Sequence, residues 1–340
     1  MRVLWGSFAF VIMLGAAACS RGDSNARPAP NADASSAAAS ASASATPAIE
    51  GDAAPKRTTS ITRWRYVGPP GSPPRNYSSV VRGKDLLVVV GDAGSVVTSA
   101  DGLTWTRRDI GASKQLSVAA YAENKYFAAE SGVLFSSPDG QAWTKATAPG
   151  PVIDIVSISD KALLVSRGAT FSSVDGSRWE RHAAPALSVE HVAVGGGRVV
   201  AVGSVDAEVF VFTSTDGTKW SKQPLAAAKG EIARSLLWAM DAFWIATASG
   251  RIYRSADGAS WSKVGEVSLK DDVAIALAHG SGVFVLVSGR KGRGSVHSSE
   301  DGRTWTKEAE LSSAPAAMTF GHRTFVIVGD GNAIVSSEPL

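Results

Sequence analysis

A seven-residue motif, SxDGxxW, recurs six times in this chain without a gap. The copies begin at Ser99, Ser137, Ser173, Ser214, Ser255 and Ser299. Each ends in a tryptophan, and one further tryptophan, Trp64, precedes the first copy by one interval. From Trp64 onward, successive motif tryptophans are 41, 38, 36, 41, 41 and 44 residues apart. A period near 40 residues is typical of the four-stranded blades of a β-propeller.

Each period contains short runs rich in β-branched and aromatic residues. Such runs cover residues 86–90, 243–246, 283–287 and 325–328, and each is followed by glycine or serine. Asp-Gly between two strands is a strong hairpin signal, because glycine takes the positive φ that the turn requires. We therefore expect strands a, b, c and d in each blade, with the motif forming the hairpin between c and d.

The two ends of the repeat region complement one another. Trp64 supplies a strand d with no earlier strands, whereas residues 315–338 supply strands a, b and c with no strand d. Pairing them removes the open sheet edges of an unclosed ring. Residues 61–340 number 280, or 40 for each of seven blades. The sequence thus predicts an all-β, seven-bladed β-propeller whose last blade is closed by the N-terminal strand.

SxDGxxW resembles the Asp-box, or BNR repeat, of sialidase-like and photosystem-assembly-factor-like propellers. That motif is usually SxDxGxTW, so all six copies here lack one residue between Asp and Gly. Sialidase activity would also require an arginine triad and a tyrosine nucleophile, and no Phe/Tyr-Arg-Ile-Pro segment lies near the first blade. The usual sialidase ring has six blades. The resemblance therefore implies the propeller fold rather than the activity.

The repeated motif residues have structural roles in this interpretation. Short polar Ser and Asp side chains can bond backbone N–H groups within the hairpin, and tryptophan can fill the space between blades. The carboxylates lie one per blade, too far apart for paired acid-base chemistry. The residues concerned are Asp101, Asp139, Asp175, Asp216, Asp257 and Asp301, with Trp64, Trp105, Trp143, Trp179, Trp220, Trp261 and Trp305.

A candidate ligand or partner site comes from aligning the seven copies at the start of strand a. At two successive alignment positions, three neighbouring blades carry charged or polar residues. These are Asp154 in one blade, Glu190 and His191 in the next, and Arg234 and Ser235 in the third. We expect these side chains to converge at one mouth of the central channel, where they could bind a small polar ligand or a protruding loop of a partner. A solvated channel lined by polar strand ends is the alternative.

The loop containing Arg290, Lys291 and Arg293 is the densest basic run outside the N-terminal region. On the same face it could meet an anionic partner, or it could be a solvated loop. The five histidines show no close pairing, and no GxSxG motif occurs. We therefore expect no metal, cofactor or catalytic residue, and the net charge of +3 argues against nucleic-acid binding.

The N-terminal 18 residues are typical of a signal peptide, with Arg2 followed by an apolar stretch. Cys19, the single cysteine, follows three alanines and resembles the lipidated cysteine of bacterial lipoproteins, although Ala16 stands where that family usually has leucine. Cleavage by ordinary signal peptidase is the alternative. Residues 19–60 are rich in Ala, Ser and Pro and are expected to form a disordered tether.

Together these features predict a monomeric, non-catalytic envelope lipoprotein that binds or scaffolds a protein or polysaccharide partner. Its membrane attachment would be an N-terminal lipid, on the periplasmic side or at the cell surface. Two other functions stay open at this point. One is a glycosidase or lyase acting on envelope polysaccharide, and the other is an assembly helper for a membrane complex.

Overall fold

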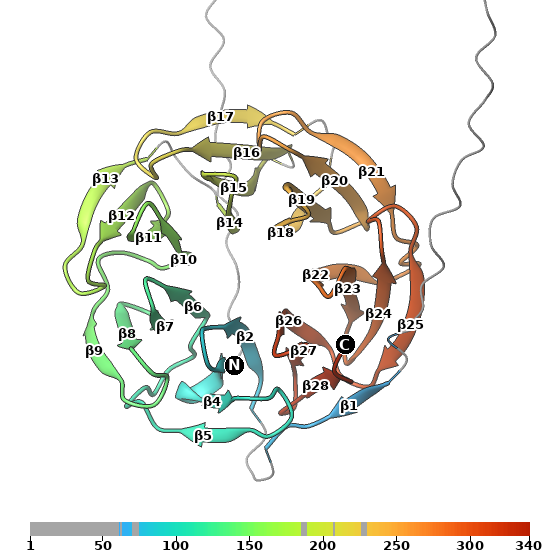
Figure 1. Ribbon diagram of the computed structural model, residues 1–340, viewed down its shortest axis with the longest axis horizontal. Coiled ribbons are helices and arrows are strands. Elements are labelled where there is room, and N and C mark those ends of the chain that lie inside the picture. The colour runs from blue at the N-terminus through green and yellow to red at the C-terminus, as the bar shows by residue number, and fades with distance from the viewer. Residues whose placement is uncertain (1–60, 62, 70–74, 185–188, 207, 226–229) are drawn as a thin grey trace, which may run out of the picture. The chain divides into compact units, whose positions relative to one another are not determined.

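A computed structural model describes residues 61, 63–69, 75–184, 189–206, 208–225 and 230–340. These residues form seven four-stranded antiparallel sheets arranged in a ring (Figure 1). In six of these sheets the innermost strand begins the blade in chain order and the outermost strand ends it, whereas the outermost strand of the seventh sheet comes from the start of the repeat region. The predicted signal peptide, Cys19 and tether lie outside the described residues. Within the described ranges, no helix is both long and apolar enough to cross a membrane.

Blades 1 to 4 follow the order of the chain. Blade 1 comprises β2 (Tyr77–Arg82), β3 (Leu87–Gly91), β4 (Val96–Ser99) and β5 (Thr106–Arg108), with a short 3₁₀ helix, η1 (Asp92–Gly94), between β3 and β4. Blade 2 comprises β6 (Val118–Ala122), β7 (Lys125–Glu130), β8 (Val133–Ser137) and β9 (Thr144–Thr147). Blade 3 comprises β10 (Asp154–Ile158), β11 (Lys161–Ser166), β12 (Ala169–Ser173) and β13 (Glu180–Ala183). Blade 4 comprises β14 (His191–Gly195), β15 (Arg198–Val205), β16 (Glu208–Ser214) and β17 (Ser221–Pro224).

Blades 5 to 7 complete the ring. Blade 5 comprises β18 (Ala233–Ala239), β19 (Ala242–Thr247), β20 (Arg251–Ser255) and β21 (Ser262–Glu266). Blade 6 comprises β22 (Val273–Gly280), β23 (Val283–Arg290), β24 (Arg293–Ser299) and β25 (Thr306–Leu311). Blade 7 comprises β26 (Pro315–Gly321), β27 (Thr324–Gly329), β28 (Ile334–Ser337) and, from the start of the repeat region, β1 (Trp64–Tyr66).

The first and last strands of the ring close blade 7. Strand β1 pairs antiparallel with β28, with Trp64 opposite Ser337 and Tyr66 opposite Val335. The indole N–H of Trp64 donates to the carbonyl of Ile61 at 3.2 Å. Figure 1 shows β1, in blue, against the red strands of the C-terminal end. The predicted seven blades and their closure by the N-terminal strand are therefore confirmed.

The core consists of seven clusters, each shared by two neighbouring blades. Every cluster contains one motif tryptophan packed toward the preceding blade. Trp105, for example, joins Leu87 of blade 1 to Val326 of blade 7. The second strands are buried along nearly their whole length because both faces of each sheet are covered by neighbours. The motif tryptophans therefore lie between neighbouring blades.

The motif hairpins share one hydrogen-bond network, as the residue types predict. In the first copy, the Ser99 hydroxyl donates to Asp101 Oδ1 at 2.9 Å and accepts the N–H of Gly102 at 2.8 Å. Asp101 Oδ1 also accepts the N–H groups of Leu103 and Thr104 at 2.8 and 2.7 Å. Gly102 has φ +75° and faces Thr324 of the preceding blade so closely that a Cβ would clash.

The same donors stabilise the ionised motif aspartates. In the second copy, the N–H groups of Ala142 and Gln141 hold the pKa of Asp139 below its usual range. In the fifth copy, the corresponding N–H groups of Ser260 and Ala259 lower the pKa of Asp257 to about 2. These carboxylates are hydrogen-bonded within their own hairpins.

Candidate functional site

The inner strands line a cavity of about 770 Å³ in the central channel. All seven strands contribute to its wall, and all run in the same direction along it. We define the channel mouth as the end of this cavity where the inner strands begin. Connections within antiparallel blades alternate between the two ends, so the mouth faces away from the motif hairpins. The volume lies within the usual range for ligand pockets in proteins.

The structure brings five of the predicted site residues together at the channel mouth. They are Asp154, the first residue of β10; Glu190 and His191, at the start of β14; and Arg234 and Ser235, in β18. Blades 3, 4 and 5 that carry them are consecutive in the ring (Figure 1). The mouth is therefore charged on these three blades.

The predicted basic loop lies at the mouth end of blade 6 but outside the cavity lining. Arg290 and Arg293 flank the hairpin between β23 and β24, and neither they nor Lys291 line the cavity. The Arg290 guanidinium donates to the carbonyl of Asp271 at 3.3 Å, and Arg293 lies 3.8 Å from the carboxylate of Asp272. Both arginines therefore contact the loop that enters their own blade, rather than the residues at the channel mouth.

Three serines at the mouth connect neighbouring blades. Ser78 donates to the carbonyl of Leu116 at 2.5 Å, and Ser79 accepts the N–H of Ala119 at 3.2 Å. Ser235 accepts the N–H of Leu277 at 3.1 Å. These hydroxyls hold the inner strands of blades 1 and 2, and of blades 5 and 6, at a fixed distance. Ser235, which was predicted as a residue of the ligand or partner site, makes this hydrogen bond between blades 5 and 6.

Burial at the mouth destabilises the ionised forms of Asp154 and Glu190. Burial raises the pKa of Asp154 to about 7, although its carboxylate accepts the N–H of Ile155 at 2.7 Å. Burial also raises the pKa of Glu190, and Arg234 opposes that effect. Burial, followed by the nearby Arg234 charge, lowers the pKa of His191 to about 4. Near neutral pH the histidine is therefore uncharged, and Asp154 is close to half protonated.

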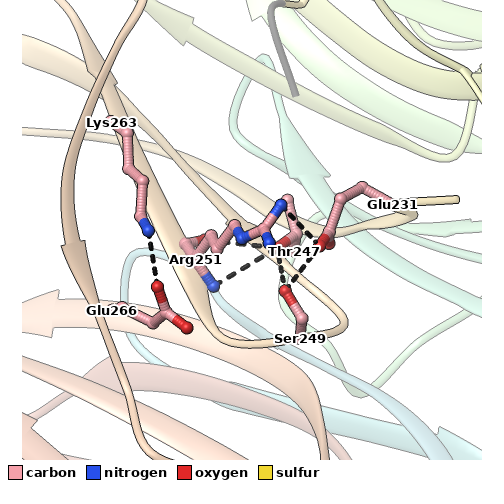
Figure 2. Close-up of polar contacts among 6 residues, drawn as sticks. All are labelled: Glu231, Thr247, Ser249, Arg251, Lys263 and Glu266. Carbon is pink, nitrogen blue, oxygen red and sulfur yellow. Dashed lines mark hydrogen bonds and ion pairs between the residues drawn. The ribbon is translucent and has the colours of Figure 1, made fainter. Parts of the chain in front are cut away.

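The buried carboxylates of neighbouring loops have cationic partners. Glu231, just before β18, lies 3.1 Å from the Arg251 guanidinium and accepts the Ser249 hydroxyl at 2.7 Å. Figure 2 shows this group, in which the Arg251 N–H also donates to Thr247 at 3.3 Å. Asp272, before β22, has Arg293 near one oxygen and accepts the Ser295 hydroxyl at 3.4 Å. Glu231 and Asp272 thus each lie beside a guanidinium group.

The far part of the cavity is aromatic, which the sequence analysis missed. Tyr121, Trp238, His279 and Phe320 line it near the ends of their inner strands. Each ring packs within 5 Å, centroid to centroid, on an aromatic residue of the adjacent second strand. Trp238 covers Gly195 and Phe320 covers Gly280, each on the preceding blade, so closely that a Cβ would clash. Their spacing along the repeat could have revealed them.

Within the described ranges, no group of three or more His, Cys, Asp or Glu side chains is arranged to hold a metal ion. Two histidines outside the mouth make structural contacts. His279 packs on Phe284, and burial lowers its pKa. The His182 ring lies 2.8 Å from the hydroxyl of Ser172 across adjacent strands.

Comparison with known proteins gives the same fold. A family model described as the DUF6242 beta propeller domain matches residues 179–320, from the end of blade 3 into the first strand of blade 7. The chain is a β-propeller. No curated protein matches it.

Several solved structures share this propeller fold. YCF48 from Cyanidioschyzon merolae is 15% identical with a TM-score of 0.65, covering 81% of this chain and 98% of its own. A structure of YCF48 bound to D1 peptide is 17% identical with a TM-score of 0.62, covering 80% and 97%. Virginiamycin B lyase from Staphylococcus aureus is 9% identical with a TM-score of 0.67, covering 81% and 98%. At these identities the likeness concerns the fold alone.

Proposed function

We propose that this protein is a non-catalytic binding propeller that holds a segment of a partner protein at the channel mouth. The observation that carries the proposal is the convergence of Asp154, Glu190, His191 and Arg234 on one cavity. The carboxylates of the motif hairpins and of Glu231 are occupied by contacts within the fold. The channel mouth, in contrast, combines charge with open space.

The size and rigidity of the cavity suit an inserted chain segment or loop. The ring is closed, and inter-blade hydrogen bonds from Ser78, Ser79 and Ser235 fix the inner strands, so the wall is preorganised. A preorganised site loses less conformational entropy on binding. A propeller of the same fold, YCF48, has been solved with a bound peptide. This supports a peptide-binding role here but names no partner.

A site-specific photocrosslinker tests the proposal in cells. It is placed at Ala316, which is exposed on the rim of the cavity, and as a control at Val174, which is 71% exposed in a motif hairpin at the other end. We expect a discrete crosslinked protein from position 316 only, with a severalfold loss when Asp154→Asn and Arg234→Ala are combined. Equal labelling from position 174, or a crosslinking profile unchanged by the double variant, would contradict the proposal.

The cellular address is a second part of the proposal. A lipid on Cys19 would hold the propeller at the membrane, facing the periplasm or the cell surface, as a monomer. That the motifs are Asp-boxes and that Cys19 is lipidated stay predictions. Changing Cys19 to Ala should move the protein from the membrane to the soluble fraction. Continued membrane retention of this variant would refute lipid anchoring.

A further inference from the structure

Asp154 is a half-buried carboxyl group that faces the open cavity and has no ion-pair partner among the described residues. Its carboxylate accepts the N–H of the next residue, Ile155. Within the described part of the chain, no Lys, Arg or His forms an ion pair with it. By contrast, Glu231 and Asp272, near the same end of blades 5 and 6, are paired with Arg251 and Arg293. Glu231 and Asp272 therefore have counter-charges, whereas Asp154 has none among the described residues.

The residues on either side of Asp154 provide no positive charge that would stabilise its carboxylate. On one side, the start of the adjacent inner strand β6 and the residue before it present Val118 and Ser117, which carry no charge. On the other side, β14 presents Glu190, a further acid, and His191, which is neutral at pH 7. Arg234 acts on Glu190 and His191 rather than on Asp154. A ligand cation would thus meet two carboxyl groups on blades 3 and 4.

The opposite wall of the mouth is apolar. Blades 6 and 7 contribute Ile275, Ala276, Ala316 and Ala317 at the positions that are charged in blades 3 to 5. Met318 and Leu277 continue this wall deeper into the cavity. A segment that fills the mouth must therefore combine a positive charge on one side with apolar surface on the other.

We propose that the partner segment bound at the channel mouth inserts a lysine or arginine side chain toward Asp154 and lays neighbouring apolar side chains against Ile275 and Ala316. This inference rests on the proposed function and specifies the chemistry of its ligand. Asp154 provides the principal charged contact, and Glu190 adds a second, more exposed carboxylate at the rim.

Blocked peptides test the charge preference directly. The probe is acetyl-Leu-Ala-Lys-Ala-Leu-amide, and its matched partner carries Nε-acetyl-lysine, which has a similar shape without the charge. Binding to the full chain is followed by NMR titration. We expect the lysine peptide to bind about tenfold tighter or more, the usual order for a hydrogen bond to a charged group. A peptide with glutamate in place of lysine should bind weakest.

The Asp154→Asn variant should remove most of the preference for the lysine peptide. Asp241→Asn is the control, because Asp241 is exposed in the hairpin between β18 and β19 at the other end of the channel. The control has the same change in charge and should bind both peptides as the unaltered protein does. If Asp154→Asn impaired folding, its spectrum would change throughout the propeller rather than at the mouth, and Glu190→Gln would then provide the comparison.

A pH series adds a readout that a purely structural residue would not give. The lysine cation favours ionised Asp154, so the affinity for this peptide should rise as the pH increases from 6 to 8, through the pKa of about 7. Of the groups facing Asp154 from blade 4, His191 titrates near pH 4 and does not contribute to the rise. Burial also raises the pKa of Glu190, so this carboxylate contributes a smaller part of the rise. The rise should be much reduced in Asp154→Asn and absent for the acetyl-lysine peptide.

Three results would overturn the inference. They are equal or tighter binding of the acetyl-lysine peptide, no saturable binding of the lysine peptide at millimolar concentrations, and equally tight binding of free n-butylamine, which would assign the site to small amines. If the crosslink from position 316 still depends on Asp154 and Arg234, the first two results reject the proposed lysine or arginine contact but leave the proposed function intact. Loss of that dependence rejects the proposed function itself.

Discussion

The two ends of the blades differ in how strongly their residues repeat and in how they treat a carboxylate charge. At the hairpin end, six near-identical motifs repeat the same hydrogen bonds, and their aspartates are stabilised as anions by backbone N–H groups. At the channel mouth, equivalent positions differ from blade to blade, and Asp154 is destabilised as an anion. Repetition marks what every blade needs to fold. Departure from repetition, combined with an electrostatic cost, is characteristic of a binding site.

This contrast predicts that substitutions at the two ends change the free energy of unfolding and the binding affinity in different ways. Substitutions in the motifs should lower the free energy of unfolding and leave the chemistry of the mouth intact. Substitutions of the charged residues at the mouth should impair binding while leaving stability unchanged or raising it. A result in which both ends respond alike would remove the distinction between them.

The largest effect is expected from Trp105→Ala. This tryptophan is 8% exposed and packs between blades 7 and 1, beside the closure of the ring. Its removal should lower the free energy of unfolding by about 3 to 5 kcal/mol, measured by urea denaturation. Trp105→Phe should cost clearly less, because the buried indole N–H finds no hydrogen-bond partner among the residues that the structure describes. A loss below about 1 kcal/mol for Trp105→Ala would show that the blades do not depend on this contact.

Asp154→Asn should stabilise the protein at pH 8. The folded-state pKa of about 7 lies above the usual aspartate value of 3.8, so ionising this carboxyl opposes folding. The stability associated with its protonated form is complete below pH 4 and is lost as the pH rises through 7. Allowing for partial exposure, we expect the variant to gain about 2 kcal/mol at pH 8. The gain should shrink toward pH 4, and a destabilised variant at pH 8 would reverse the comparison.

Ser137→Ala tests the hairpin end without altering charge. Ser137 is fully buried, and its hydroxyl donates to Asp139 and accepts the N–H of Gly140 at 2.8 Å. Alanine leaves that N–H unsatisfied, so we expect a loss of about 1 to 2 kcal/mol in urea denaturation. The lysine-peptide affinity should not change. A loss of affinity would mean that the two ends are coupled.

The sequence predicted the ring because its evidence was periodic. Six motifs and Trp64 each specify one blade, and the two incomplete ends can only complete one another. The charged residues of the mouth followed from the same alignment. The alignment did not explain why adjacent residues such as Arg234 and Ser235 both line the cavity, since strand alternation would turn one of them away. A register shift between Ala233 and Ser235 accounts for this, and bulges of this kind have no clear sequence signal.

The far aromatic positions were missed for a different reason. Tyr121, Trp238, His279 and Phe320 share a position near the ends of their inner strands, but chemically they are a phenol, an indole, an imidazole and a phenyl ring. A search for identical residues passes over such a column, whereas a search for planar rings would find it. Their cross-strand partners and the glycines beneath Trp238 and Phe320 depend on contacts between blades.

The smallest effect should come from removing a single motif charge by Asp257→Asn. The N–H groups of Ser260 and Ala259 lower the pKa of Asp257 to about 2, so its contribution to stability is present above pH 4 and lost as the pH falls toward 2. Because Asp257 is exposed and asparagine keeps one acceptor oxygen, we expect a loss of only about 0.5 to 1 kcal/mol at pH 7. The loss of stability in Asp257→Asn should vanish near pH 2. Its sign is opposite to that of the stability gain expected for Asp154→Asn. Thermal unfolding across this range, with Asp241→Asn as a control of equal charge change, would reveal whether the hairpin aspartates gain stability from ionisation while the mouth aspartate loses it.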